Sequence, residues 1–78
     1  MIAVATLNMM ATKGYLLSTA KYQFSESGPP FVARCHVEHK TIGLISAEGA
    51  HRGSKADAKQ AAAEQVLRKI EREDAGRS

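Results

Sequence analysis

SKADAKQAAAEQVLRKI, residues 54–70, is the stretch of sequence that decides the fold. Ser54 has a side-chain oxygen suited to cap a helix, and Asp57 follows three residues later, which is nearly a capping box. Small and apolar residues then recur at three- and four-residue steps and form one stripe: Ala58, Ala61, Ala62, Val66 and Ile70, flanked by Ala63 and Leu67. We expect a helix to about Glu73 that sits close to a sheet, with a polar end, residues 71–78, that frays.

Upstream of this helix, three segments have the period-two pattern of strands. The clearest is Phe31 to His39, whose inward set is Phe31, Ala33, Cys35 and Val37. Before it, residues 20–25 place Tyr22 and Phe24 on one face, and we interpret both as core residues rather than as platforms for base stacking. After it, residues 41–47 carry Ile42 and Leu44.

The connections between the predicted strands have typical turn residues. Ser27-Gly28-Pro29-Pro30 breaks the chain between the first two strands, because glycine permits positive φ and proline removes a backbone donor. A short hairpin connection near His39 and Lys40 joins the second strand to the third. The two glycines within residues 48–53 predict a loop that leads into the C-terminal helix.

The N-terminal segment predicts another helix. Its apolar residues recur at helical steps, with Gly14 as a stop: Ala3, Leu7, Met10 and Ala11, with Leu17 closing the face. The fold class is therefore α+β, in the order α-β-β-β-α, with a three-stranded antiparallel sheet and both helices packed on one face. We expect one domain over residues 1–78, with its core at about residues 5–70 and a polar tail after it.

Length and composition limit the class of protein. A chain of 78 residues has a thin core and little room for an enclosed active site, so we expect the domain itself not to be an enzyme. The lone cysteine, Cys35, has no partner for an internal disulfide. The apolar run 1–11 lacks the positively charged n-region of a signal peptide, so we expect it not to be one. No stretch approaches the ~20 apolar residues of a membrane-spanning helix. We expect a cytoplasmic or nuclear location, no membrane partner and no cofactor.

The basic residues gather where the C-terminal helix begins. Between residues 51 and 59, three cations (Arg52, Lys55 and Lys59) outnumber one anion, Asp57, which gives a local charge of +2. Lys55 and Lys59 are four residues apart and so lie on one helix face. The first turn of a helix has unpaired N–H groups and a positive dipole end, which attract anions. This cluster predicts a site for phosphates, although charge alone fits an ordinary solvated helix start as well.

The sequence resembles the double-stranded-RNA-binding domain family over roughly residues 5–70. The resemblance rests on Ser27-Gly28-Pro29-Pro30 after an aromatic strand and on residues 54–67, SKADAKQAAAEQVL, in which lysines, small residues and the final apolar pair have the family's spacing. The family binds A-form RNA by its shape, across two minor grooves and the major groove between them. The resemblance implies RNA contacts by the start of the second helix, the first helix and the loop between the first two strands. The residues concerned are Lys55, Lys59, Arg52, Ser54, His51, Asn8, Thr12, Lys13, Pro29 and Pro30.

Several positions depart from the family's pattern. Ala56 replaces a second helix lysine, Met9 replaces a glutamate of the first helix, and Thr12 replaces a nearby glutamine. Phe31 occupies the place of a histidine that commonly follows the Gly-Pro turn. The resemblance therefore implies that the second helix keeps most of its contacts, whereas the first helix and the loop between the first strands are weakened.

Other interpretations remain beside RNA binding. One alternative is that this chain is a divergent copy of the same fold that acts as a protein-interaction or dimerisation module. Its third strand, as a sheet edge, would offer free backbone groups to a partner or a second copy. Cys35, His36 and His39 are metal-ligand types, but strand alternation sends Cys35 and His36 to opposite faces. Residues 49–55 have the wrong spacing and order for a nucleotide-binding P-loop.

Overall fold

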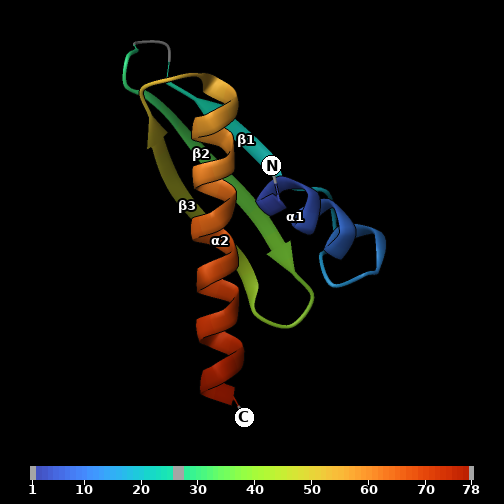
Figure 1. Ribbon diagram of the computed structural model, residues 1–78. Coiled ribbons are helices and arrows are strands. Elements are labelled where there is room, and N and C mark those ends of the chain that lie inside the picture. Colours follow the sequence, from blue (N-terminus) through green and yellow to red (C-terminus); the bar gives the residue numbers. More distant parts are fainter. Residues whose placement is uncertain (1, 26–27, 78) are drawn as a thin grey trace.

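The computed structural model describes residues 2–25 and 28–77, and side chains as far as residue 73. The chain forms helix α1 (Ile2–Thr12), strands β1 (Lys21–Phe24), β2 (Phe31–His39) and β3 (Gly43–His51), and helix α2 (Lys55–Arg77) (Figure 1). Ser27 of the predicted turn and Ser78 of the predicted tail lie outside the described residues. The predicted order α-β-β-β-α is confirmed.

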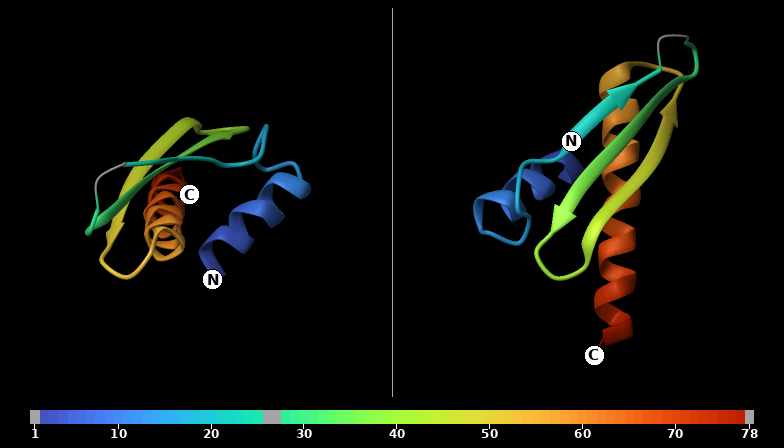
Figure 2. Two further views of the ribbon diagram at one scale, coloured as in Figure 1. Left: turned by 90° about the horizontal axis from the view of Figure 1, so that it is seen from above. Right: turned by 180° about the vertical axis from the view of Figure 1, so that it is seen from behind.

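The three strands form one antiparallel sheet with β2 in the centre. Tyr22 of β1 and Ala47 of β3 both lie opposite Cys35 of β2. Both helices cover the same face of the sheet, as Figure 2 shows from above. The other face is open to solvent and carries polar pairs, including the ion pair between Arg34 and Glu48 at 3.3 Å. The sheet therefore buries the inward set predicted from alternation: Ala33, Cys35 and Val37 are buried, and Phe31 is half-buried.

Helix α2 packs on β2 and β3 through its stripe of small residues. Ala58, Ala62 and Val66 are fully buried. At Gly49 of β3, a Cβ atom would collide with the backbone at Ala61 and Ala62, so glycine is required for this close approach. The alanines and the glycine together set the distance between helix and sheet, and thereby hold the start of α2 at one end of the sheet.

Helix α1 packs beside α2 rather than over the middle of the sheet (Figure 2). Ala3 and Leu7 are buried, and the Val4 N–H donates to the Gln60 side-chain oxygen of α2 at 3.2 Å. The helix ends in the predicted glycine: Gly14 has φ +86°, which suits a residue without a Cβ atom.

The end of α1 is a Schellman motif. The Gly14 N–H donates to the Ala11 carbonyl and the Tyr15 N–H to the Met10 carbonyl, at 3.2 and 2.9 Å. After it, Leu16 forms a bridge with His39 of β2 and is buried. Because neighbouring residues of an extended segment point in opposite directions, Leu17 is 63% exposed. The prediction that Leu17 closes the apolar face was therefore wrong, and Leu16 takes that place.

Three other expectations need correction. The third strand spans Gly43–His51, not residues 41–47, so the predicted loop is strand as far as His51. Helix α2 ends at Arg77 and not at about Glu73, since residues 71–75 contain no helix breaker. Phe24 is 40% exposed and not a core residue, because it ends a strand at the sheet edge.

Candidate nucleic-acid interface

The start of α2 is capped as the sequence predicts. The Ser54 hydroxyl accepts the Asp57 N–H and donates to the Asp57 carboxylate, each at 3.1 Å, and the Ser54 carbonyl accepts the Ala58 N–H, also at 3.1 Å. This cap occupies only one of the N–H groups that a helix start leaves without helical partners. The N–H groups of Lys55 and Ala56 therefore stay available to an anion in front of the helix.

The two lysines of α2 have different surroundings. The side chain of Lys55 is exposed and makes no hydrogen bond, ion pair or ring contact with any described residue. Lys59, one turn further on, is half-buried, and its Nζ lies 4.6 Å from the centre of the Tyr22 ring of β1. The structure thus brings both predicted lysines to one helix face, with one ammonium free and the other held over an aromatic ring.

The segment before α2 adds polar groups to the same end of the molecule. His51 Nδ1 accepts the Gly53 N–H at 2.9 Å and lies 3.6 Å from the Asp57 carboxylate. Both contacts hold the His51 ring beside the start of α2. Arg52 is exposed beside it. Arg52, Lys55 and Lys59 surround the capped helix start, and Asp57 is the acidic residue among them.

The connection between β1 and β2 lies at this end as well. Phe31, the first residue of β2, is opposite His51, the last residue of β3. Consequently, residues 28–30, which lead into β2, lie beside the segment that leads into α2. Figure 1 shows this end of the sheet at the top. Both prolines are exposed, and the ring of Phe31 covers Gly28, where a Cβ atom would lie 2.7 Å from a ring carbon. Two of the three predicted contact regions are therefore adjacent.

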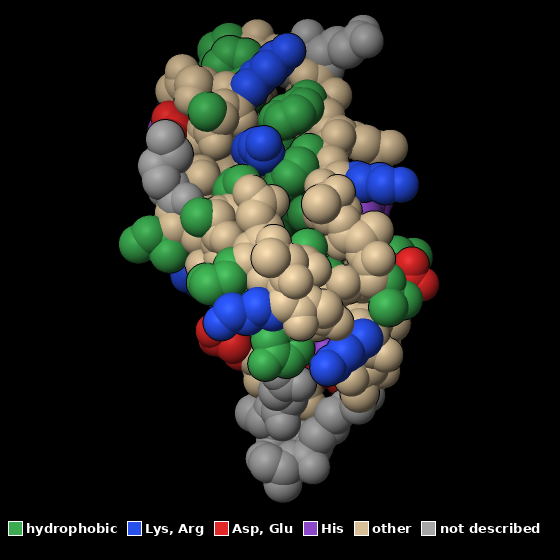
Figure 3. All heavy atoms as spheres, turned by 90° about the vertical axis from the view of Figure 1, so that its right-hand side faces the viewer, with side chains coloured by type: hydrophobic (Ala, Val, Ile, Leu, Met, Phe, Trp, Pro, Cys, Tyr) green, Lys and Arg blue, Asp and Glu red, His purple; other side chains and the backbone are tan. Residues whose placement is uncertain are grey.

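The third predicted region, α1, presents few polar groups. Asn8, Thr12 and Lys13 are exposed, as predicted, but the Thr12 hydroxyl donates to the Asn8 carbonyl within the helix at 3.0 Å. The same helix also exposes apolar residues, with Ile2 82% and Met9 50% accessible. In Figure 3, which views this side of the molecule, basic side chains stand apart with hydrophobic ones between them.

The comparison with protein families identifies the family of the chain. The family described as Double-stranded RNA binding motif matches residues 12–70, about three quarters of the chain. The chain belongs to this family. The matched part contains the sheet, the basic start of α2 and all but the last turns of α2, whereas only Thr12 of α1 lies within it. Comparisons with curated proteins and with solved structures found no match.

A double-stranded RNA binding motif is a non-catalytic module, and double-stranded RNA is its ligand. The described residues hold no group of three or more histidine, cysteine or acidic side chains placed to bind a metal ion. Cys35 is buried on the helix side of the sheet, whereas the His36 ring lies on the open side, 3.3 Å from the Gln23 side-chain oxygen. None of the described helices combines the length and apolar character that crossing a membrane requires.

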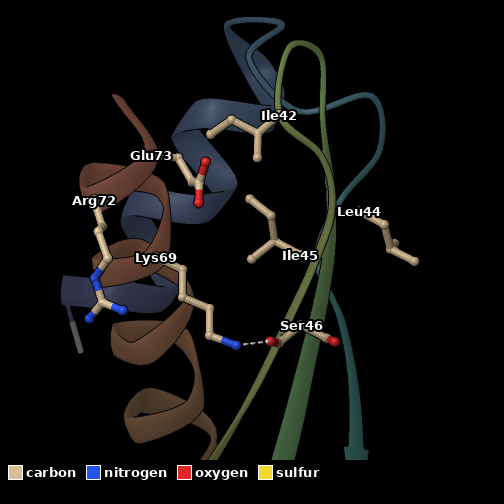
Figure 4. A pocket seen from close by; sticks show the side chains of 7 residues that line it. All are labelled: Ile42, Leu44, Ile45, Ser46, Lys69, Arg72 and Glu73. Carbon is tan, nitrogen blue, oxygen red and sulfur yellow. Dashed lines mark hydrogen bonds between the residues drawn. The ribbon is translucent and has the colours of Figure 1, made fainter. Parts of the chain in front are cut away.

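A second surface of this motif lies along β3, which is an edge strand as the sequence analysis assumed. A hollow of about 440 Å³ separates the strand from the C-terminal half of α2, lined by Ile42, Leu44, Ile45, Ser46, Lys69, Arg72 and Glu73 (Figure 4). Lys69 Nζ donates to the Ser46 carbonyl at 2.7 Å. This contact links the strand to the helix across the hollow.

The contact between Tyr22 and Lys59 was not predicted from the sequence. Alternation correctly directs its ring toward the helices, but no pattern within the sequence indicates which helix residue meets the ring. That contact depends on how far α2 lies from the sheet, which Gly49 and the alanines of α2 set. Burial raises the pKa of the Tyr22 phenol, with the neighbouring Cys35 adding to the shift.

Proposed function

We propose that this domain binds double-stranded RNA by its shape and its phosphates, largely without regard to sequence, with the start of α2 as the principal contact. The supporting observation is the placement of Lys55 and Lys59 one turn apart on a capped helix start. Both face the same way, and the positive end of the helix dipole lies beside them. A run of phosphates along one RNA strand meets such a pair without any contact to a base edge.

The neighbouring residues would extend this contact. Arg52 would add a charged hydrogen bond to a phosphate, and the free N–H groups that follow Ser54 would donate to the oxygens of a phosphate group. His51 lies next to Gly53 and Asp57 and would offer its second ring nitrogen. The two exposed prolines, Pro29 and Pro30, would place their carbonyls near sugar hydroxyls of an adjacent minor groove.

Helix α1 would make the weaker contribution. Asn8 and Lys13 can reach a sugar hydroxyl or a phosphate, and Thr12 keeps an acceptor lone pair beside its internal hydrogen bond. Recognition of A-form RNA by family members relies on minor-groove hydroxyls. An α1 surface with Ile2 and Met9 exposed offers little to those hydroxyls.

We further propose that the domain is a module of a larger RNA-processing or RNA-regulating protein in the cytoplasm or the nucleus. A fold of this size has no evident room for an enclosed catalytic centre. Its single cysteine is free and buried, which suits a reducing compartment.

A competition experiment tests the proposed function. Labelled duplex RNA is bound to the protein and displaced by unlabelled duplex RNA or duplex DNA of the same length. We expect RNA to displace it much more effectively, because the 2′-hydroxyls and the A-form groove are part of what is recognised. Two RNA duplexes of unrelated sequence should compete equally. Equal competition by DNA would overturn shape recognition.

The salt dependence of RNA binding provides a second test, which measures the contribution of phosphate contacts. Two to four phosphate contacts predict a slope of log K against log salt of about −2 to −4, from the coefficient per contact known for DNA. The variant Lys21→Ala removes one exposed lysine from the open face of the sheet and should leave the slope unchanged. If the folded protein binds neither duplex and sediments as a dimer, the result would instead support a protein-interaction module that uses the edge of β3.

A further inference from the structure

The Tyr22–Lys59 contact is a direct link between β1 and α2. Strand β1 packs mainly on β2, and α2 packs mainly on β2 and β3, so few other contacts join these two elements. Lys59 Nζ lies 4.6 Å from the ring centre, within the distance at which an ammonium is attracted to an aromatic face. The contact therefore ties a basic side chain of the RNA surface to the sheet.

The side chain of Tyr22 is held in one place. The residue lies opposite Cys35, which is fully buried, and its phenol oxygen is enclosed near that cysteine. Swinging the side chain away would move that oxygen out of its enclosed place, so the ring stays beneath Lys59. The phenol is neutral at ordinary pH, burial raises its pKa further, and the neutral ring attracts the ammonium through its π face.

A held ammonium has a consequence for binding. A lysine side chain has four rotatable bonds, and an unrestrained side chain loses rotamer freedom when its ammonium contacts a phosphate. The ring removes part of this freedom beforehand. It contacts one side of the ammonium and leaves N–H donors on the other side for phosphate oxygens. Lys55, which has no such ring, serves as the internal comparison.

We propose that Tyr22 is a positioning residue of the RNA surface, whose ring holds the Lys59 ammonium above β1 in the place where a phosphate meets it. This role rests on the proposed function, since it assumes that Lys59 contacts RNA. The ring carries the role and the hydroxyl does not. Tyr22→Phe keeps the ring and should therefore bind RNA like the wild-type protein.

A double-mutant cycle tests the role. The dissociation constant for one RNA duplex is measured for Tyr22→Leu in the wild-type, Lys59→Ala and Lys55→Ala backgrounds, with circular dichroism to show that each variant is folded. We expect Tyr22→Leu to weaken binding by roughly two- to fivefold in the wild-type and Lys55→Ala backgrounds, the change that an exposed cation–π contact supplies. In the Lys59→Ala background it should cause no further loss.

A second measurement is independent of RNA. Protons next to Lys59 Nζ lie over the ring, so their NMR signals should be shifted upfield in the wild-type protein and in Tyr22→Phe, and not in Tyr22→Leu. Equal losses of affinity in all three backgrounds, or an unshifted signal in the wild-type protein, would overturn the positioning role alone. Absence of RNA binding by the folded wild-type protein would overturn the proposed function, and this role with it.

Discussion

The start of α2 and the outward surface of α1 are both exposed, but their chemistry differs. Lys55 and Lys59 project from a capped helix start with free N–H groups, beside Arg52 and the β1–β2 connection. The outward surface of α1 combines Ile2 and Met9 with a few neutral polar groups and the single charge of Lys13. The first surface suits phosphates, whereas the second offers little that a polyanion would bind.

This difference separates two tasks within one small fold. The buried residues of α1, Ala3 and Leu7, complete the core beside α2, so α1 chiefly contributes stability. The start of α2 contributes the charges. The two regions also differ in the family match, which contains the whole start of α2 but only the final residue of α1. Substitutions in the two regions should accordingly affect different measurements.

The largest expected effect is on stability. Leu7 is fully buried in α1, so Leu7→Ala should lower the free energy of unfolding by about 2–5 kcal/mol, from lost burial and the cavity left behind. Urea denaturation followed by circular dichroism measures this loss. Under conditions where the variant stays folded, its affinity for duplex RNA should be close to that of the wild-type protein. A large loss of affinity in the folded variant would show that α1 shapes the RNA contact directly.

The next effect is on binding. Lys55→Ala and Lys59→Ala should each weaken duplex RNA binding by ~1–2 kcal/mol, the range of a hydrogen bond to a charged group. Gel-shift titration with two duplexes of unrelated sequence measures it, and the loss should be the same for both because phosphates carry no base information. The unfolding free energy should change little for Lys55→Ala, and by no more than about 1 kcal/mol for Lys59→Ala, which also loses the contact with the Tyr22 ring. A loss confined to one RNA sequence would indicate base contacts instead.

A smaller effect should follow from the loss of the helix cap. Ser54→Ala removes the acceptor of the Asp57 N–H and should lower the unfolding free energy by about 1 kcal/mol. Ser54→Asp retains a capping oxygen and serves as the control for stability. Thermal melts of the three proteins measure the difference. Equal stability of Ser54→Ala and the wild-type protein would mean that the cap contributes nothing.

The smallest effect should come from α1. Lys13→Ala removes one exposed charge that has no neighbouring helix start, and should weaken RNA binding by less than about 0.5 kcal/mol, as expected for an isolated surface position. The same gel-shift titration measures it beside Lys59→Ala. A loss as large as that of Lys59→Ala would remove the distinction between the two regions.

Much of the fold follows from local sequence patterns. The bounds of β2 were predicted correctly because alternation from Phe31 to His39 is unbroken, and the cap at Ser54 follows from its spacing to Asp57. The third strand was predicted too short because Gly49 reads locally as a loop residue. Glycine is required at this position by a segment that is distant in sequence, because the backbone of α2 leaves no room for a side chain there.

The site was predictable where it depends on one segment. The lysines of α2 are found from helical spacing alone. The contact of Lys59 with Tyr22 joins segments 37 positions apart and depends on the packing of α2 against the sheet, which no local pattern encodes. The exposure of Phe24 similarly follows from its place at the sheet edge and not from its alternation with Gln23.

The central claim is that the start of α2, and not α1, holds the RNA. It is tested most directly by titrating one RNA duplex with two double-alanine variants, Lys55→Ala/Lys59→Ala and Asn8→Ala/Lys13→Ala, after circular dichroism has shown both to be folded. We predict that the α2 variant loses about 2–4 kcal/mol of binding free energy, the sum of two contacts to charged groups, and that the α1 variant keeps nearly all of it. Wild-type affinity in the folded α2 variant would contradict the account.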